Sequence, residues 1–87
     1  MEYHLKTLVF TSQERVIRTL GNEIWEALCD NLPAPKFVLK EAAEVIIREF
    51  GYSAKTASLY TRAVVKNVMA ESPGMVLVKR GKYYYWV

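Results

Sequence analysis

Positive charge at helical spacing is the feature of this chain best suited to chemistry. Lys55, Arg62 and Lys66 fall on one side of a segment in which each residue advances about 100° around a helix axis. No Asp or Glu occurs between positions 51 and 70, so nothing nearby in the sequence neutralises these cations. An uncompensated row of cations favours binding to a regular array of anions.

Other reactive residue types lack partners. His4 is the single histidine, and we interpret it as a solvated side chain. Cys29 is the single cysteine, which excludes an intrachain disulfide, and no basic neighbour lowers its pKa, so we interpret it as a structural thiol. Glu23, Glu26 and Asp30 share a helix face that could hold a hard cation, but without a second ligand cluster we expect a solvated acidic face.

Size and composition restrict the function further. The 87 residues form one domain, which is too small for a sizeable internal catalytic cavity. Without a glycine-rich phosphate loop or metal-ligand spacing, we expect no enzyme activity, no cofactor, no metal and no small-molecule ligand. The absence of a long apolar run or a signal peptide predicts no membrane contact and a cytoplasmic location.

The charge is divided unevenly along the chain. Residues 1–50 hold six Lys/Arg against eight Asp/Glu, a balance of −2, whereas residues 51–87 hold six against one, a balance of +5. Such asymmetry favours one basic surface for nucleic acid, although an uneven surface alone would look the same.

The elements that position the cations follow from hydrophobic spacing. A helix over 12–31 is predicted after a capping-box start at Thr11 and Glu14. Its apolar stripe comprises Ile17, Leu20, Ile24 and Leu28. Before it, 1–10 is undecided between a short strand and a helical extension, and after it 36–39 suits a brief extended segment.

Two further helices are predicted in close succession. The first covers 40–50, and Gly51 suits the left-handed position after its end. The second covers 54–71, with Ser53 as N-cap and Pro73-Gly74 as the stop. A connection this short forces the helices to cross at a large angle, as in a helix-turn-helix.

The last part, 75–87, is predicted to be a β-hairpin. Its turn is either Arg80-Gly81 or a bulge at Gly81. Alternation places Tyr83 and Tyr85 on one face and Tyr84 and Trp86 on the other, together with Lys82. Because that lysine suggests exposure, we expect Tyr83 and Tyr85 in the core. Lys79 and Arg80 join Lys82 as a cationic tip.

This order of elements resembles the winged-helix family of DNA-binding domains. The similarity lies in KFVLKEAAEVIIREFGYSAKTASLYTRAVVKNV followed by VLVKRGKYYYWV, and it covers residues 12–87. The chain is most similar to the small winged-helix proteins of archaea and their viruses. The resemblance implies an α+β fold of three helices with a C-terminal hairpin wing and, in this chain, a possible short N-terminal strand.

The resemblance also implies a recognition helix in the major groove and a wing on the backbone or minor groove. On this chain the recognition positions are Lys55, Ser58, Leu59, Arg62 and Lys66, and the wing positions are Lys79, Arg80 and Lys82. Arg62 suits a guanine edge, because its fork satisfies two acceptors, and Lys66 suits a phosphate. Lys55 and Ser58 can reach bases or phosphates. Leu59 either touches a thymine methyl or is an ordinary surface leucine.

We therefore expect a sequence-specific, double-stranded DNA-binding protein, a homodimeric transcriptional regulator without a ligand domain. The dimer rests on small size and on the aromatic surplus around Tyr84 and Trp86. The alternative is a winged-helix module that binds a protein partner through the aromatic hairpin and does not bind DNA. RNA binding stays open, although the sequence shows no evident stacking platform on a sheet.

Overall fold

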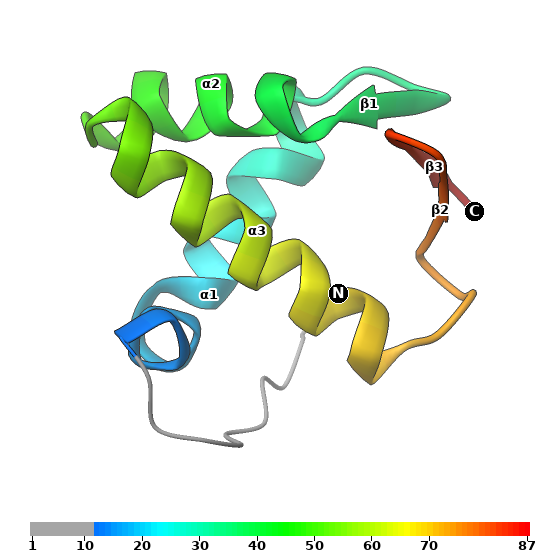
Figure 1. Cartoon of the computed structure of the whole chain (residues 1–87), viewed down its shortest axis with the longest axis horizontal. Helices are drawn as coiled ribbons and strands as arrows, with labels where there is room; N and C mark the ends of the chain where they lie inside the picture. The colour runs from blue at the N-terminus through cyan, green and yellow to red at the C-terminus, as the bar shows by residue number, and fades with distance from the viewer. Residues whose placement is uncertain (1–11) are drawn as a thin grey trace.

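The computed structural model describes residues 12–87, with side chains from Leu20 onward, as three helices and a small sheet (Figure 1). In chain order the elements are α1 (Ser12–Asn31), β1 (Lys36–Val38), α2 (Leu39–Phe50), α3 (Ala54–Glu71), β2 (Leu77–Arg80) and β3 (Tyr83–Trp86). This is the predicted α+β, winged-helix-like architecture. The undecided segment 1–10, with its possible short strand, and the Thr11 cap lie outside the described residues. None of the described helices has the length and apolar character needed to cross a membrane.

The two helices of the helix-turn-helix diverge from a tight connection. α2 ends at Gly51, which takes the expected left-handed conformation (φ 74°) and donates its backbone N–H to the Ile47 carbonyl at 2.9 Å. α3 begins after Ser53, whose hydroxyl accepts a hydrogen bond from the Thr56 N–H at 3.2 Å. Both predicted caps are confirmed, and α3 runs back from the connection obliquely to α2 (Figure 1).

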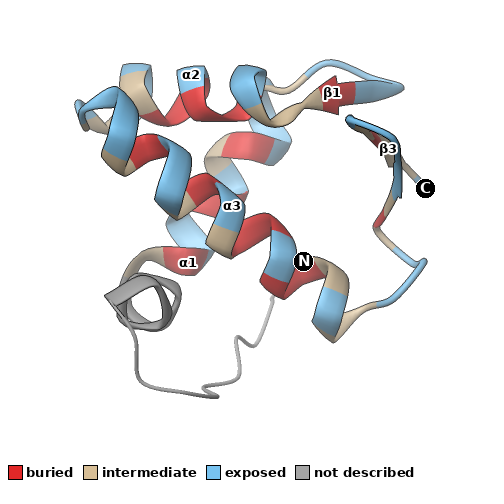
Figure 2. Cartoon of the chain, in the orientation of Figure 1, coloured by how far each residue is buried: buried red, intermediate tan, exposed pale blue. Residues whose placement is uncertain are grey.

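The core lies where the three helices meet the inner side of the sheet. Figure 2 shows buried positions on the sides of α2 and α3 that face one another. α1 contributes Ile24, Trp25 and Leu28, of which Ile24 and Leu28 were predicted. α3 contributes a stripe of Ala57, Val64 and Val68, all fully buried. The remaining face of α3 is thereby left for solvent.

The sheet is antiparallel and has the strand order β1-β3-β2. Its middle strand, β3, pairs Tyr84 with Phe37 of β1 and with Lys79 of β2. Two hydrogen bonds from Trp86 also fix β3 to the loop before β1. The Trp86 backbone N–H donates to the Pro35 carbonyl, and the indole Nε1–H donates to the Pro33 carbonyl, each at 2.9 Å.

The predicted faces of the hairpin are wrong. Tyr84 is only 7% exposed, and Trp86 packs against the core, whereas Tyr83 and Tyr85 are half-exposed on the opposite face. The reason is that Phe37, on the inner face of β1, contacts the ring of Tyr84, and Trp25 of α1 contacts the ring of Trp86. The lysine used to choose the face lies in the turn, where its charge does not mark a side of the sheet.

The predicted turn is also displaced by one residue. Arg80 pairs with Tyr83, so the two-residue loop is Gly81-Lys82 and neither of the predicted alternatives occurs. Gly81 has φ 63°, and no residue other than glycine has a positive φ in the described part of the chain. A glycine with positive φ at the first loop position, followed by a residue with negative φ, is the pattern of a type II′ turn.

Candidate nucleic-acid interface

The exposed side of α3 carries the residues predicted to contact DNA. We call Lys55, Ser58, Leu59, Arg62 and Lys66 the basic row, and all five are exposed. They lie opposite the buried stripe of α3, so one surface of the helix is apolar and internal while the other is cationic and open. Leu59 is 38% exposed, which is consistent with either of its two interpretations. The three predicted wing cations, Lys79, Arg80 and Lys82, are also exposed.

A groove of about 380 Å³ runs between α2 and α3. From α3 it is lined by Ala54, Ser58 and Arg62, two of which belong to the basic row. From α2 it is lined by Leu39, Lys40, Ala43, Glu44 and Ile47. Two members of the basic row, Ser58 and Arg62, therefore form part of one wall of a concave surface.

Sequence reasoning missed the α2 side of this groove. Lys40 adds a cation and Glu44 adds a carboxylate, and both are exposed. The absence of acidic residues thus holds for α3 but not for the groove as a whole. No local signal identifies these two residues, because their proximity to Arg62 depends on how α2 and α3 cross.

The ring of Tyr84 connects the helix face with the wing. Burial raises the pKa of the Tyr84 hydroxyl, and the positive charge of Arg62 acts in the opposite direction. On the wing side, the Lys79 Nζ lies 5.9 Å from the centroid of the same ring. Arg62 of α3 and Lys79 of β2 thus both lie near one buried residue, and they bring the two predicted cationic elements together.

The other candidate groups do not form a site. Among residues 20–87, whose side chains the structure describes, no three His, Cys, Asp or Glu side chains converge as metal ligands would. Cys29 is exposed, and partial burial of its thiol, with a further contribution from the Asp30 carboxylate, raises its pKa above the ordinary value. A raised pKa leaves less thiolate, so this sulfur is a weak nucleophile.

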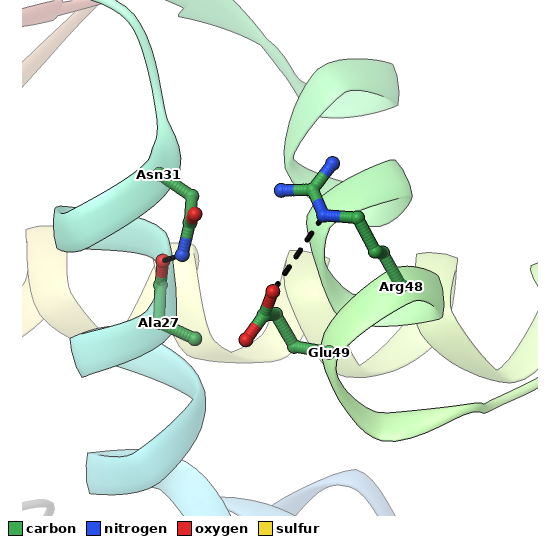
Figure 3. Close-up of polar contacts among 4 residues, drawn as sticks. All are labelled: Ala27, Asn31, Arg48 and Glu49. Carbon is green, nitrogen blue, oxygen red and sulfur yellow. Dashed lines mark hydrogen bonds and ion pairs between the residues drawn. The ribbon is translucent and has the colours of Figure 1, made fainter.

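One ion pair is found among the side chains that the structure describes, and it lies outside the groove. The Arg48 Nε is 3.6 Å from the Glu49 Oε2, and both side chains are well exposed on α2 (Figure 3). At the end of α1, the Asn31 amide donates to the Ala27 carbonyl at 2.8 Å (Figure 3). Exposed pairs of this kind add little stability, so Arg48 provides a cation for control experiments.

Comparisons with protein-family models, with curated proteins and with solved structures find no match for this chain. The winged-helix-like assignment therefore stands on the order of the elements, the three-stranded antiparallel sheet and the C-terminal hairpin. Function has to be argued from the geometry of the surface.

Proposed function

We propose that the protein binds double-stranded DNA through the basic row and the wing. The observation that carries this proposal is the exposed row of cations on α3, together with the exposed wing cations Lys79, Arg80 and Lys82. A helix with one cationic, solvent-facing side fits the width of the major groove. A wing joined to that side lies where the adjacent backbone or minor groove would pass.

The roles of the individual residues follow from their chemistry. Arg62, in the groove wall, has the fork that pairs with the O6 and N7 of guanine, and Glu44 opposite it can accept from the amino group of cytosine. Lys66 lies one helical turn further from the α3 N-terminus and suits a phosphate contact. Lys55 and Ser58 lie in the first turns of α3, where side chains reach base edges in this class of motif.

In this proposal the protein acts as a transcriptional regulator that recognises a specific site. The homodimer stays a prediction, and one of its two grounds is lost, because Tyr84 and Trp86 pack inside the fold. What supports a dimer now is the small size of the domain alone. A palindromic target would be its signature, since two-fold protein symmetry demands two half-sites at a fixed spacing.

The test is a selection from random duplex DNA at near-physiological salt, followed by titration of the enriched sequence against a scrambled duplex. We expect a defined motif bound at least about a thousandfold more tightly than the control, with affinity that falls steeply as salt rises. Equal binding to all duplexes would indicate an architectural role. No binding to any duplex would contradict the proposal and favour the protein-interaction module.

Matched variants then locate the interface. Arg62→Ala with Lys66→Ala should weaken binding to the selected duplex at least about tenfold and make its salt dependence shallower, because two contacts to bases or phosphates are lost. Arg48→Ala removes a cation of equal charge outside the groove and should change the affinity less than about twofold. Full affinity in the double variant would show that α3 does not read the DNA.

A further inference from the structure

The outer face of the sheet, turned away from the core, presents two aromatic rings to solvent. Because directly paired residues share a face, the register assigns six residues to this outer sheet face. They are Lys36, Val38, Val78, Arg80, Tyr83 and Tyr85. Tyr83 and Tyr85 are half-exposed at its centre on the middle strand, and the two cations flank them on the neighbouring strands.

Lys36 lies against both rings. Its Nζ is 4.4 Å from the centroid of Tyr83 and 5.7 Å from that of Tyr85. The two ring centroids are 6.4 Å apart and the ring planes meet at 62°. Lys82 adds a second ammonium 5.4 Å from the Tyr83 ring. The Lys36 ammonium thus lies close to two tyrosine rings whose planes are inclined to each other.

The charged residues of the strands in this region are all cations, and the Glu41 carboxylate reaches the end of β1, where it accepts the Val38 N–H at 2.9 Å. β1 contains no Asp or Glu, and neither does the chain from Ser72 to Val87. The same two stretches place Lys36 and Arg80 on the outer sheet face and Lys82 in the turn beside it, whereas Lys79 pairs with Tyr84 on the inner face. A partner that suits this face must therefore be anionic and must also offer flat groups that stack on aromatic rings.

We propose that the outer sheet face binds single-stranded nucleic acid. One base stacks on Tyr83 and displaces the Lys36 ammonium from that ring, a neighbouring base stacks on Tyr85, and the displaced ammonium pairs with the phosphate between the two bases. Aromatic stacking combined with a cationic track is how single strands are held without base-specific hydrogen bonds. Because the two rings are inclined to each other, the bases are splayed apart, as they are in proteins that bind single strands.

This site shares Arg80 and Lys82 with the wing but is separate from the basic row of the proposed duplex interface. The bases of a duplex are stacked on one another, so their faces are closed to Tyr83 and Tyr85, and a duplex offers this surface only its phosphates. The basic row lies on α3, whereas these rings lie on the side of the sheet that faces away from the helices. One domain would thus hold duplex through α3 and an unpaired strand beside the wing.

The experiment titrates the intact protein into a fluorescently labelled oligothymidine and, separately, into a labelled duplex. Tyr83→Val with Tyr85→Val removes both rings but keeps residues that favour strands. Tyr83→Phe with Tyr85→Phe is the matched control, because it keeps the rings and removes only the hydroxyls. We expect the valine variant to bind oligothymidine at least about tenfold more weakly and the phenylalanine variant to bind it within about threefold of the wild type.

If circular dichroism shows that the valine variant is unfolded, a charge variant still tests whether this face binds the single strand. Lys36→Ala changes one exposed side chain and should weaken oligothymidine binding and make its salt dependence shallower. Arg62→Ala with Lys66→Ala should leave oligothymidine binding unchanged while it weakens duplex binding. That contrast separates the two proposals, because either interaction can be lost while the other survives.

Three results would overturn the inference. Failure of the wild type to bind oligothymidine would favour a protein partner for the outer sheet face. A folded valine variant with unchanged affinity would show that the rings do not stack on bases. Equal loss of oligothymidine binding in the Arg62, Lys66 variant would place the single strand on α3 instead.

Discussion

The ring of Phe37 stacks on the ring of Tyr84, with the centroids 5.5 Å apart and the planes inclined by 15°. Phe37 comes from β1, the short strand before the helix-turn-helix, and Tyr84 comes from β3, the last strand of the wing. Both residues are buried. This contact attaches the wing to the helical core, so the orientation of the wing cations depends on it.

Truncation of this contact should destabilise the whole domain. Phe37→Ala removes a fully buried ring, and we expect the free energy of unfolding to fall by about 3–5 kcal/mol. Phe37→Leu keeps most of the apolar volume and should cost less. Urea denaturation followed by tryptophan fluorescence measures both. The neighbouring Lys36→Ala, at an exposed position, serves as the control. A loss of unfolding free energy below about 1 kcal/mol in Phe37→Ala would contradict the packing of the two rings.

Alkaline pH should weaken the fold through Tyr84. Burial raises the pKa of its hydroxyl above the ordinary value of 10.0, so the folded state keeps the proton at a pH where the unfolded chain has released it. The stabilising effect is complete below pH 10.0 and is lost as the pH rises through the folded-state pKa. The unfolding free energy of Tyr84→Phe should therefore decline less in this range. Urea denaturation of both proteins at neutral and at alkaline pH measures this decline. An equal loss of unfolding free energy in the wild type and in Tyr84→Phe would refute the prediction.

The left-handed backbone at Gly51 should make this position sensitive to any side chain. A Cβ added there meets no atom within 4 Å, so the cost of Gly51→Ala comes from the backbone conformation alone. We expect a loss of about 1–2 kcal/mol in the unfolding free energy. Gly51→Asn should cost less, because asparagine tolerates this conformation better. Thermal and urea denaturation of the two variants give the comparison, and equal costs would show that the backbone is not the cause.

The Ser53 cap should stabilise the start of α3. Its hydroxyl accepts the Thr56 N–H, and Ser53→Ala leaves this donor without its side-chain acceptor. The expected cost is about 1 kcal/mol, and Ser53→Asp, which keeps an acceptor, should restore it. Amide hydrogen exchange in the first turn of α3 reports the effect locally. If protection there were the same in Ser53→Ala as in the wild type, the cap would be dispensable.

Local signals predicted the helices well. α1 and α3 have the expected bounds, and α2 begins one residue earlier than expected, at Leu39. The predictions at Gly51 and Ser53 were correct because a cap depends on residues next to it in the chain. The exposure of the basic row followed in the same way, from the spacing of the apolar residues opposite it.

The faces of the sheet could not be predicted, because they depend on contacts between residues distant in the chain. Tyr83 to Trp86 are four consecutive aromatic residues, so alternation alone does not say which pair is buried. The choice is made by Phe37 and Trp25, which lie far earlier in the sequence. The α2 side of the groove was missed for the same reason, because Lys40 and Arg62 line one groove only as a result of how α2 and α3 cross.

The central place of β3 has a consequence for how the domain assembles. β1 and β2 do not pair with each other, and each gains its ladder only from β3, the last of the three strands to be synthesised. β2 and β3 are joined by a two-residue loop, so their pairing is local. β1 pairs with β3 across the whole helix-turn-helix, so that pairing is long-range. Long-range pairing is slow, because the chain must lose entropy before the contact forms. The helices should therefore be in place first, and the outer sheet face should be the last surface to become complete.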